Sequence, residues 1–422
     1  MIFGLVDCIS YYCSVVQVFK PELKGKPVVV LSNNDGAIVS LTKEAKKIDG
    51  VKRGVPIFTI KDIVKQNKIN VFSSNYSLFE DISLRVFHTL GCFTPEIERY
   101  SIDEAFLQFK GYEYYDIVEY AKHIVAVTIK NTGIPVSMGL AHTKTLSKVA
   151  NKLSKSDPDC QGVKSLLSKD EIAVGLKDFP IEDVWGIGGR YAALLHGMGI
   201  RTASQFLKLN PEWIKKNMNI TGLRMWHELQ GKSCIPLEQI PPGKKGMCTS
   251  RSFGKLMTAC EPISEAIANY GAVCARKLRA QHSCCKTMKV FIQTHPFRMD
   301  LPQYNASKLI VFDVPTNNTF EIVSKAQEAF SEIFKKGYHY KKAGIMVMDI
   351  IPENQVQANF FDIVDREKQS KVMNALDLIN GRFGHDVVRL GSQGYGRDWK
   401  LKSDNLPPNY TTQMNDLIQI II

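Results

Sequence analysis

Two short apolar segments, far apart in the chain, each run directly into acidic residues, and they constrain the fold more than any other feature. The first segment is Ile2–Val6, followed by Asp7, and the second is Tyr100–Ile102, followed by Asp103 and Glu104. Both segments have the apolar character of buried strands. A carboxylate in apolar surroundings costs several kcal/mol unless it is paired or binds a metal ion. Three such groups in one place therefore predict a counter-cation.

Magnesium is the cation that these acidic residues favour, because Mg²⁺ prefers carboxylate and phosphate oxygens. Two such ions about 4 Å apart are the usual means of displacing pyrophosphate from a nucleotide. The alternative is that an Asp at a strand end is a turn or cap residue. Neighbouring strand residues point to opposite faces, so Asp103 and Glu104 can face one site only through a twist or bulge. The pair Tyr11-Tyr12, just after Asp7, favours the functional interpretation.

Length, charge and cysteine content narrow the class of protein. At 422 residues the chain has room for roughly three domains. Its 54 Lys and Arg residues against 42 Asp and Glu residues give a net charge of +12, which favours a polyanionic partner. The ten cysteines show no zinc-type spacing, so we expect reduced thiols in a cytoplasmic protein. We expect no signal peptide and no membrane association, since no apolar run approaches the length of a membrane span.

Residues 21–69 have the signals of a small module. A strand at Pro27–Leu31 leads into Ser32–Gly36, where Asn-Asp-Gly supplies the left-handed geometry of a tight reversal. A second strand and a short helix follow, with Lys43 and Lys46 three residues apart on one helix face. Two ammonium groups near a carboxylate-metal site suit a triphosphate. The alternative is a solvated lysine face.

Residues 70–170 alternate between strands and helices and end in a helix with a basic stripe, which finishes at Lys155. Residues 171–236 have the pattern of a compact helical domain. A glycine-rich turn there carries Gly186 and Gly188 at the start of a helix, where backbone amides can approach a phosphate. This pattern resembles a helix-hairpin-helix on a nucleic-acid backbone. A plain interhelical turn is the alternative.

Residues 246–350 predict the order strand, helix, strand, strand, helix, strand. Arg251 lies in the first of these strands, between serines and apolar residues, as a sheet face on a sugar-phosphate backbone requires. Residues 351–422 are polar and predict an extension with a limited core of its own.

These motifs together resemble one family in both content and order. The chain is similar over essentially its full length to the Y-family translesion DNA polymerases, and among them to the UmuC-like branch. This resemblance implies an α+β fold of the right-hand polymerase type. The motifs that carry it are Lys26–Gly36, Phe72–Tyr76, Tyr100–Phe106, Asp183–Gly188, Ser250–Gly254, Tyr340–Gly344 and Tyr410–Thr412.

The resemblance also implies names for the modules. It gives a palm at 1–20 and 70–170, fingers at 21–69, a helical thumb with a helix-hairpin-helix at 171–236, a little finger of βαββαβ order at 246–350 and a UmuC-type C-terminal extension at 351–422.

Matching positions imply the roles of individual residues at the reaction centre. Tyr12 matches the steric gate, a ring that lies where a ribose 2′-hydroxyl would project, and Tyr11 would support the sugar beside it. The ligands of two Mg²⁺ ions would be Asp7, Asp103, Glu104 and the backbone carbonyl of Cys8.

Other matches concern the phosphates and the template. Lys46 and Lys155 fall where the family places triphosphate contacts, and Lys43 lies beside Lys46. Ala37 and Val39 would lie over the templating pair. The DNA contacts would be Gly186, Gly188 and Arg251. The chain departs from the usual family pattern at Ile9, Tyr11, Val16 and Leu41, without losing a metal ligand.

A short peptide in the extension resembles the one that bacterial polymerases insert into the sliding clamp. Gln357 is followed by the adjacent aromatics Phe360 and Phe361. In that binding mode the rings fill an apolar pocket and the amide makes polar contacts. Two exposed rings in a polar segment need such a reason.

The resemblance implies an error-prone DNA-directed DNA polymerase that performs translesion synthesis in the SOS response by two-metal nucleotidyl transfer. Its substrates would be primer-template DNA and deoxynucleoside triphosphates. Its partners would be a UmuD′ dimer, a RecA filament and the β sliding clamp. One alternative is a divergent paralogue that binds DNA and clamp but synthesises poorly. Another is a two-carboxylate palm of a different kind, such as a cyclase, against which the thumb and little-finger motifs argue.

Overall fold

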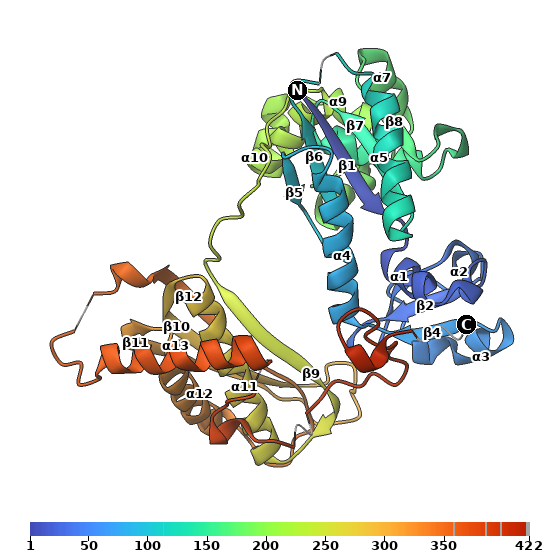
Figure 1. The fold of residues 1–422 in the computed structure, drawn as a ribbon. Helices are drawn as coiled ribbons and strands as arrows, with labels where there is room; N and C mark the ends of the chain where they lie inside the picture. Colours follow the sequence, from blue (N-terminus) through green and yellow to red (C-terminus); the bar gives the residue numbers. More distant parts are fainter. Residues whose placement is uncertain (113, 358, 385, 397–398, 419–422) are drawn as a thin grey trace. The chain divides into compact units, whose positions relative to one another are not determined.

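The two segments that run into acidic residues are paired strands in the computed structural model (Figure 1). β1 (Ile2–Cys8) lies between β6 (Glu104–Phe109) and β7 (Val136–Ala141) and is antiparallel to both. β5 (Ile97–Arg99) and β8 (Val163–Leu166) complete a five-stranded sheet of order β5-β6-β1-β7-β8. The three central strands are apolar along almost their whole length, because helices cover both faces of the sheet.

The helices on this sheet are amphipathic and bury their apolar sides against it. α1 (Tyr11–Phe19), α4 (Tyr76–Gly91) and α5 (Ile117–Thr132) share one apolar core with the sheet. α6 (Lys144–Ser154) packs against β1 and β7. This contact is close at Gly139, where a Cβ atom would come within 2.2 Å of the backbone of α6. The register of α6 on the sheet is thereby fixed.

The 21–69 module is built on a second sheet. β3 (Ile38–Leu41), β2 (Val28–Leu31) and β4 (Asn70–Ser73) form it in that order, with β2 parallel to β4. The strands bury valine and isoleucine side chains in a small core of their own. Two short helices, α2 (Lys43–Lys46) and α3 (Lys61–Gln66), complete the module.

Residues 169–229 are helical, as predicted for the 171–236 range. The helices are α7 (Lys169–Lys177), α8 (Gly189–Gly197), α9 (Ala203–Leu207) and α10 (Pro211–Leu229). They pack around a shared apolar core that also includes residues of α6.

The following part of the chain has the predicted order of strands and helices. β9 (Met247–Met257), α11 (Cys260–Ala280), β10 (Ser283–Thr294), β11 (Asn305–Thr316), α12 (Thr319–Ile333) and β12 (Tyr340–Pro352) follow one another. The sheet order is β11-β10-β12-β9, and α11 and α12 share one core with it. α11 begins at Cys260, and Pro262 lies in its first turn, where proline is tolerated.

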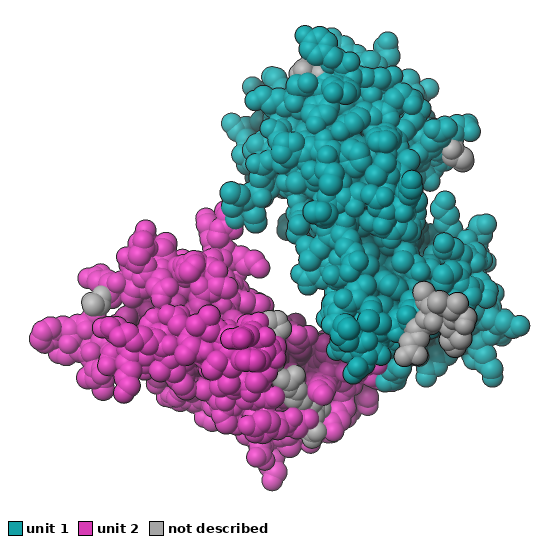
Figure 2. Space-filling model, in the orientation of Figure 1, with its two compact units in different colours: residues 1–241, 404–422 teal, residues 242–403 magenta. Residues whose placement is uncertain are grey.

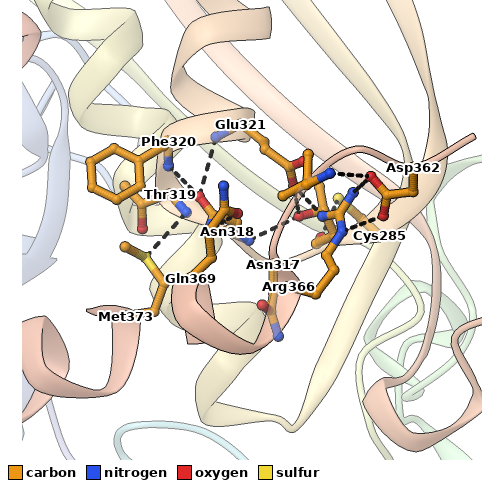
Figure 3. Close-up of polar contacts among 12 residues, drawn as sticks. Cys285, Asn317, Asn318, Thr319, Phe320, Glu321, Asp362, Arg366, Gln369 and Met373 are labelled. Atoms are coloured by element: carbon orange, nitrogen blue, oxygen red, sulfur yellow. Dashed lines mark hydrogen bonds and ion pairs between the residues drawn. The ribbon is translucent and has the colours of Figure 1, made fainter. Parts of the chain in front are cut away.

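An additional helix, α13 (Arg366–Phe383), attaches to α11 and α12 through polar contacts, and Figure 3 shows those with α12. Arg279 of α11 binds both carboxylate oxygens of Asp377, at 2.7 and 2.8 Å. Asn318, the N-cap of α12, donates to Gln369 at 2.6 Å. Few α13 side chains are buried, Met373 and Asn380 among them, as expected for a segment with a limited core.

The chain forms two units, and its end belongs to the first of them (Figure 2). Unit 1 comprises residues 1–241 and 404–422, and unit 2 comprises residues 242–403. The predicted extension 351–422 is thus divided between the units. The structure describes residues 1–112, 114–357, 359–384, 386–396 and 399–418. Within these ranges no helix has both the length and the apolar character needed to cross a membrane.

Candidate active site

The acidic site of unit 1 begins with two carboxylates on paired strands. Asp7 of β1 lies directly opposite Glu104 of β6. Burial raises the pKa of Asp7 to about 6, Lys155 acts in the opposite direction, and the nearby Glu104 adds to the rise. The negative charge of Asp7 is therefore only partly compensated by the protein.

Two lysines form ion pairs with these carboxylates. Lys155 Nζ lies 2.6 Å from Asp7 Oδ1. Lys148 Nζ donates to both oxygens of Glu104, at 3.1 and 2.9 Å, and lies 4.4 Å from the ring centre of Tyr100. Sequence reasoning identified Lys155 but saw Lys148 only as one member of a basic stripe. The helical spacing placed Lys148 on the correct face, but its pairing with Glu104 depends on how α6 packs on the sheet.

Asp103 lies in the turn just before β6. Ser101 Oγ donates to Asp103 Oδ1 at 2.6 Å and accepts the amide of Glu104 at 3.1 Å. The Asp103 carbonyl accepts the amide of Cys8 at 2.9 Å. Burial, followed by the charges of Asp103 and Asp7, raises the pKa of the Cys8 thiol. The turn thus places the backbone of Asp103 at the end of β1.

The donors present suit a hard divalent cation. Carboxylate and carbonyl oxygens are the ligands that Mg²⁺ prefers, and the raised pKa of Asp7 reflects a buried negative charge in need of a cation. In the described part of the chain, however, no three or more His, Cys, Asp or Glu side chains are gathered in metal-binding arrangement. The carboxylate oxygens of Asp7 and Glu104 instead form ion pairs with lysine ammonium groups. The metal-ligand assignment stays a prediction.

The two tyrosines after the first strand differ in accessibility. Tyr11 is 3% exposed, and its hydroxyl donates to the carbonyl of Phe79 in α4, so it belongs to the core. Tyr12 is half-buried and its ring stacks on that of Phe79, with centroids 4.5 Å apart. Of the two predicted gate residues, Tyr12 is the one that a substrate can reach.

The basic residues of the 21–69 module lie on its surface. Lys43 and Lys46 are both exposed at the ends of α2. Lys43 borders a cavity of about 400 Å³ that Ile9 and Ser10 also line. Sequence reasoning missed Arg53, an exposed residue whose positive charge lowers the pKa of Tyr12 against the larger effect of burial, which raises it. Its position between two glycine-containing turns gave no periodic signal.

The predicted glycine turn precedes α8. Gly186 has φ +90°, and a Cβ atom there would lie 2.8 Å from Met225 Sδ, so packing as well as backbone geometry requires glycine. Gly188 is the N-cap of α8, and a Cβ atom there would meet open space. Gly188 is exposed, as an approach to phosphate requires.

The remaining predicted residues lie in unit 2. Arg251 occupies an exposed position of β9, where burial alternates along the strand. Gln357 is exposed, and Phe360 and Phe361 are 96% and 84% exposed. Ala358, within the same peptide, lies outside the described residues.

Comparison with protein-family models gives four matches along the chain. The impB/mucB/samB family model matches residues 6–152, and the model of its C-terminal domain matches residues 244–360. The model of the IMS family HHH motif matches residues 169–200. A model described as a domain of unknown function matches residues 370–420.

Curated relatives match over nearly the whole chain. Protein UmuC of Salmonella typhimurium is 37% identical over 99% of this chain and 100% of its own length. Protein SamB of Salmonella typhimurium is 37% identical, and Protein MucB of Escherichia coli is 32% identical, each over 98% of both chains.

Solved structures of Y-family polymerases have the same fold. A Y-family DNA polymerase chimera of Dbh and Dpo4 has a TM-score of 0.67 at 22% identity, and it covers 83% of this chain and 100% of its own. DinB from Sulfolobus solfataricus has a TM-score of 0.53 at 23% identity with the same coverage. The predicted α+β polymerase fold is confirmed.

Proposed function

This chain belongs to the impB/mucB/samB family of UmuC-like, Y-family DNA polymerases, and from that premise we propose how its residues act in translesion synthesis. It is a DNA-directed DNA polymerase. We infer error-prone nucleotide insertion opposite damaged template bases, in the SOS response and in the cytoplasm. The observation that carries the proposal is the opposition of Asp7 and Glu104, each paired with a lysine.

The module boundaries proposed here are the ranges expected from the sequence. We propose a palm at 1–20 and 70–170, fingers at 21–69, a thumb at 171–236, a little finger at 246–350 and an extension at 351–422.

The acidic residues would hold the catalytic metal. Asp7, Asp103, Glu104 and the carbonyl of Cys8 supply oxygen donors of the kind that Mg²⁺ prefers. Two bound ions would stabilise the charge on the attacking 3′-oxygen and on the leaving pyrophosphate. Lys155 pairs with Asp7 in this structure, and it would become available to the triphosphate if a bound cation took its place.

The reaction itself is a single in-line displacement. The primer 3′-hydroxyl oxygen forms a bond to the α-phosphorus and loses its proton, while the bond from that phosphorus to the α,β-bridging oxygen breaks and pyrophosphate leaves. No covalent enzyme intermediate is needed. We propose that Lys46 and Lys155 neutralise the triphosphate, with Lys43 beside them. Arg53, through its proximity to Tyr12, is an additional cation for this role.

Sugar selection is proposed for Tyr12. Its half-buried ring stacks on the ring of Phe79, with centroids 4.5 Å apart, and lies edge-on to the ring of Tyr76, with centroids 6.3 Å apart. A ring fixed on two sides cannot retreat from a ribose 2′-hydroxyl, so it discriminates by steric clash. Tyr11, whose hydroxyl is bound to the Phe79 carbonyl, would support this arrangement from within the core.

We propose that Gly186, Gly188 and Arg251 contact DNA. Gly186 and Gly188, both exposed residues, would let a DNA backbone phosphate approach the N-terminus of α8. Arg251, exposed on β9, would contact another phosphate. Contacts of this type bind DNA independently of its sequence.

Clamp binding is proposed for Gln357, Phe360 and Phe361. The two rings lie edge to face, 5.7 Å apart, and protrude into solvent. Directly after them Asp362 accepts from Arg366 at 2.7 Å, and Arg366 also donates to Glu321 of α12 at 2.7 Å (Figure 3). The peptide is thus anchored on one side while its rings stay uncovered. An apolar pocket on a partner would relieve that exposure.

Two further partners follow from the family alone. We propose a UmuD′ dimer and a RecA filament as accessory factors of synthesis, in addition to primer-template DNA and deoxynucleoside triphosphates.

The decisive test is primer extension on undamaged and abasic templates with Mg²⁺, with and without these accessory factors. Extension past the abasic site supports the proposal. Tight binding of primer-template and clamp without extension under any of these conditions would contradict it and favour a non-synthesising paralogue.

A further inference from the structure

Three motifs meet in unit 1, and apart from Tyr76 the catalytic assignment gives their residues no role. They are the turn Ser32–Gly36, the segment Phe72–Tyr76 and the C-terminal motif Tyr410–Thr412. The turn contains the short 3-10 helix η2 (Asn33–Asp35), and Phe72–Tyr76 spans the end of β4 and the start of α4. Residues 404–410 lie against both, and they belong to unit 1.

The first set of contacts holds the carboxylate of Asp35. Asp35 Oδ2 accepts the backbone amide of Asp404 at 2.7 Å, and Asp35 Oδ1 accepts from Ser73 Oγ at 2.6 Å. Ser73 and Asn405 are themselves joined twice. The Ser73 amide donates to the Asn405 carbonyl at 2.9 Å, and the Asn405 amide donates to Ser73 Oγ at 3.0 Å. Residues 404–405 therefore close a network around the Asp35 side chain.

The second set of contacts attaches the same segment to α4 and α1. Asn75 Nδ2 donates to the Pro407 carbonyl and to Asn409 Oδ1, both at 2.9 Å. Its Oδ1 meanwhile accepts the Leu78 amide at 3.2 Å and so caps α4. The ring of Tyr410 stacks on Phe19 at the end of α1, with centroids 4.6 Å apart and planes 11° apart.

The held turn has a backbone that needs outside support. Asn34 and Asp35 have φ values of 62° and 48°, in the left-handed region that non-glycine residues rarely adopt. Such a conformation persists when the surrounding structure over-determines it. Directly after the turn come Ala37 and Val39, which the family resemblance puts over the templating base pair. The conformation of the turn therefore bears on the nucleotide pocket.

We propose that residues 404–410 are a clasp that positions the Ser32–Gly36 turn for nucleotide binding. The inference deepens the proposed polymerase function and rests on it. The clasp also gives a role to part of residues 370–420, the region that matches a domain of unknown function. The clasp residues act through Asp35 and the turn and do not touch the reacting atoms, so they are positioning residues.

The test uses point variants of the full chain. Asn75→Ser keeps a side-chain oxygen to cap α4 but removes the amide donors to the clasp. Tyr410→Ala removes the stack on Phe19, and Tyr410→Phe retains it. Met414→Ala, at a residue 83% exposed, is the control within the same segment.

Asn75→Ser removes two hydrogen bonds to the clasp, and Tyr410→Ala removes a ring stack. We expect each to raise the KM for the correct nucleotide about tenfold. The Kd for primer-template should stay at the parental value. Hydrogen exchange of the amides of residues 32–37 should be accelerated selectively. Tyr410→Phe and Met414→Ala should retain parental values in all three measurements.

Two results would overturn the inference. One is an unchanged KM together with unchanged exchange at residues 32–37. The other is faster exchange throughout unit 1 rather than at the turn, which would make the segment a general stabiliser. If the parental chain inserts no nucleotide at all, the polymerase proposal fails, whereas the exchange comparison, made without substrates, still decides whether the clasp holds the turn.

Discussion

Asp7 and Glu104 face each other across the β1–β6 pair, so two negative charges meet where the strands end. Burial with this neighbour raises the pKa of Asp7 to about 6 although Lys155 binds it. An Asp carboxyl whose pKa is higher in the folded state than in the unfolded chain makes the folded state less stable once it ionises. The site thus carries an electrostatic cost in the absence of a cation.

The first prediction follows from this cost. Asp7→Asn replaces the ionised carboxylate with a neutral isostere, so it should stabilise the metal-free protein by about 1–3 kcal/mol at pH 8. The folded pKa is about 6 and the reference value is 3.8, so the advantage should shrink as pH falls between these values and disappear below them. Thermal unfolding from pH 3.5 to 8 measures it. A variant less stable than the parent at pH 8 would show that the Lys155 pair outweighs burial.

The second prediction concerns chemistry at Asp103. Asp103→Asn should abolish nucleotide incorporation and lower Mg²⁺ affinity measured by calorimetry, while primer-template binding stays nearly intact. Glu104 is bound by Lys148, so its substitution may be tested in parallel for residual activity. Asp62→Asn, at an exposed position of α3, is the matched control. Primer extension at the parental rate by the Asp103 variant would refute the assignment.

The third prediction concerns the choice of sugar. Tyr12→Ala removes the accessible ring and should increase ribonucleotide incorporation relative to deoxyribonucleotide incorporation by at least about a hundredfold, the scale of a lost steric barrier of a few kcal/mol. Tyr12→Phe keeps the ring and should keep the parental preference. Competing nucleotides in a single-insertion assay give the ratio. An unchanged ratio in Tyr12→Ala would show that another residue selects the sugar.

The fourth prediction concerns electrostatic binding of DNA. Affinity for primer-template should fall steeply with salt and depend little on sequence. Arg251→Gln should reduce the slope of log affinity against log salt by about one unit. Lys325→Gln, on α12 and paired with Glu328, is the charge-matched control and should leave the slope unchanged. If the affinity of the parent does not depend on salt, the basic residues form only a solvated surface and do not bind DNA.

The fifth prediction concerns recruitment. Replacing both Phe360 and Phe361 with Ala should weaken clamp binding and processive synthesis, because apolar anchors carry most of an interface's energy. Single-nucleotide insertion and thermal stability should not change, since both rings are exposed. Ile363→Ala, at a neighbouring residue that is 99% exposed, is the control for lost apolar surface. A fall in melting temperature with unchanged clamp affinity would show that the rings pack within the chain.

Local patterns predicted what local physics determines. Apolar runs predict the strands that carry Asp7 and Glu104, and the spacing of lysines and apolar residues predicts α6. Tyr11 shows the limit of this approach. Its burial follows from the packing of α1 on α4, and only its hydrogen bond to Phe79 assigns it to the core.

Contacts between distant segments left no local signal. Lys148 meets Glu104 because α6 lies close to β7 at Gly139, a tertiary relationship. Asn75 and Pro407 meet although more than three hundred residues separate them, and the polar composition of the extension predicted no docking there. The motif Phe72–Tyr76, which contains Asn75, gave no indication of this contact.

The return of the chain to unit 1 at Asp404 also has a consequence for biosynthesis. Domains generally fold as units during translation, the N-terminal one first. Residues 1–241 are made well before residues 404–410, and all of unit 2 is translated in between. The hydrogen bonds of Asp35, Ser73 and Asn75 to this segment can form only after that interval. A nascent or truncated chain lacking residue 404 therefore has an incomplete unit 1, and translation itself delays maturation of the enzyme.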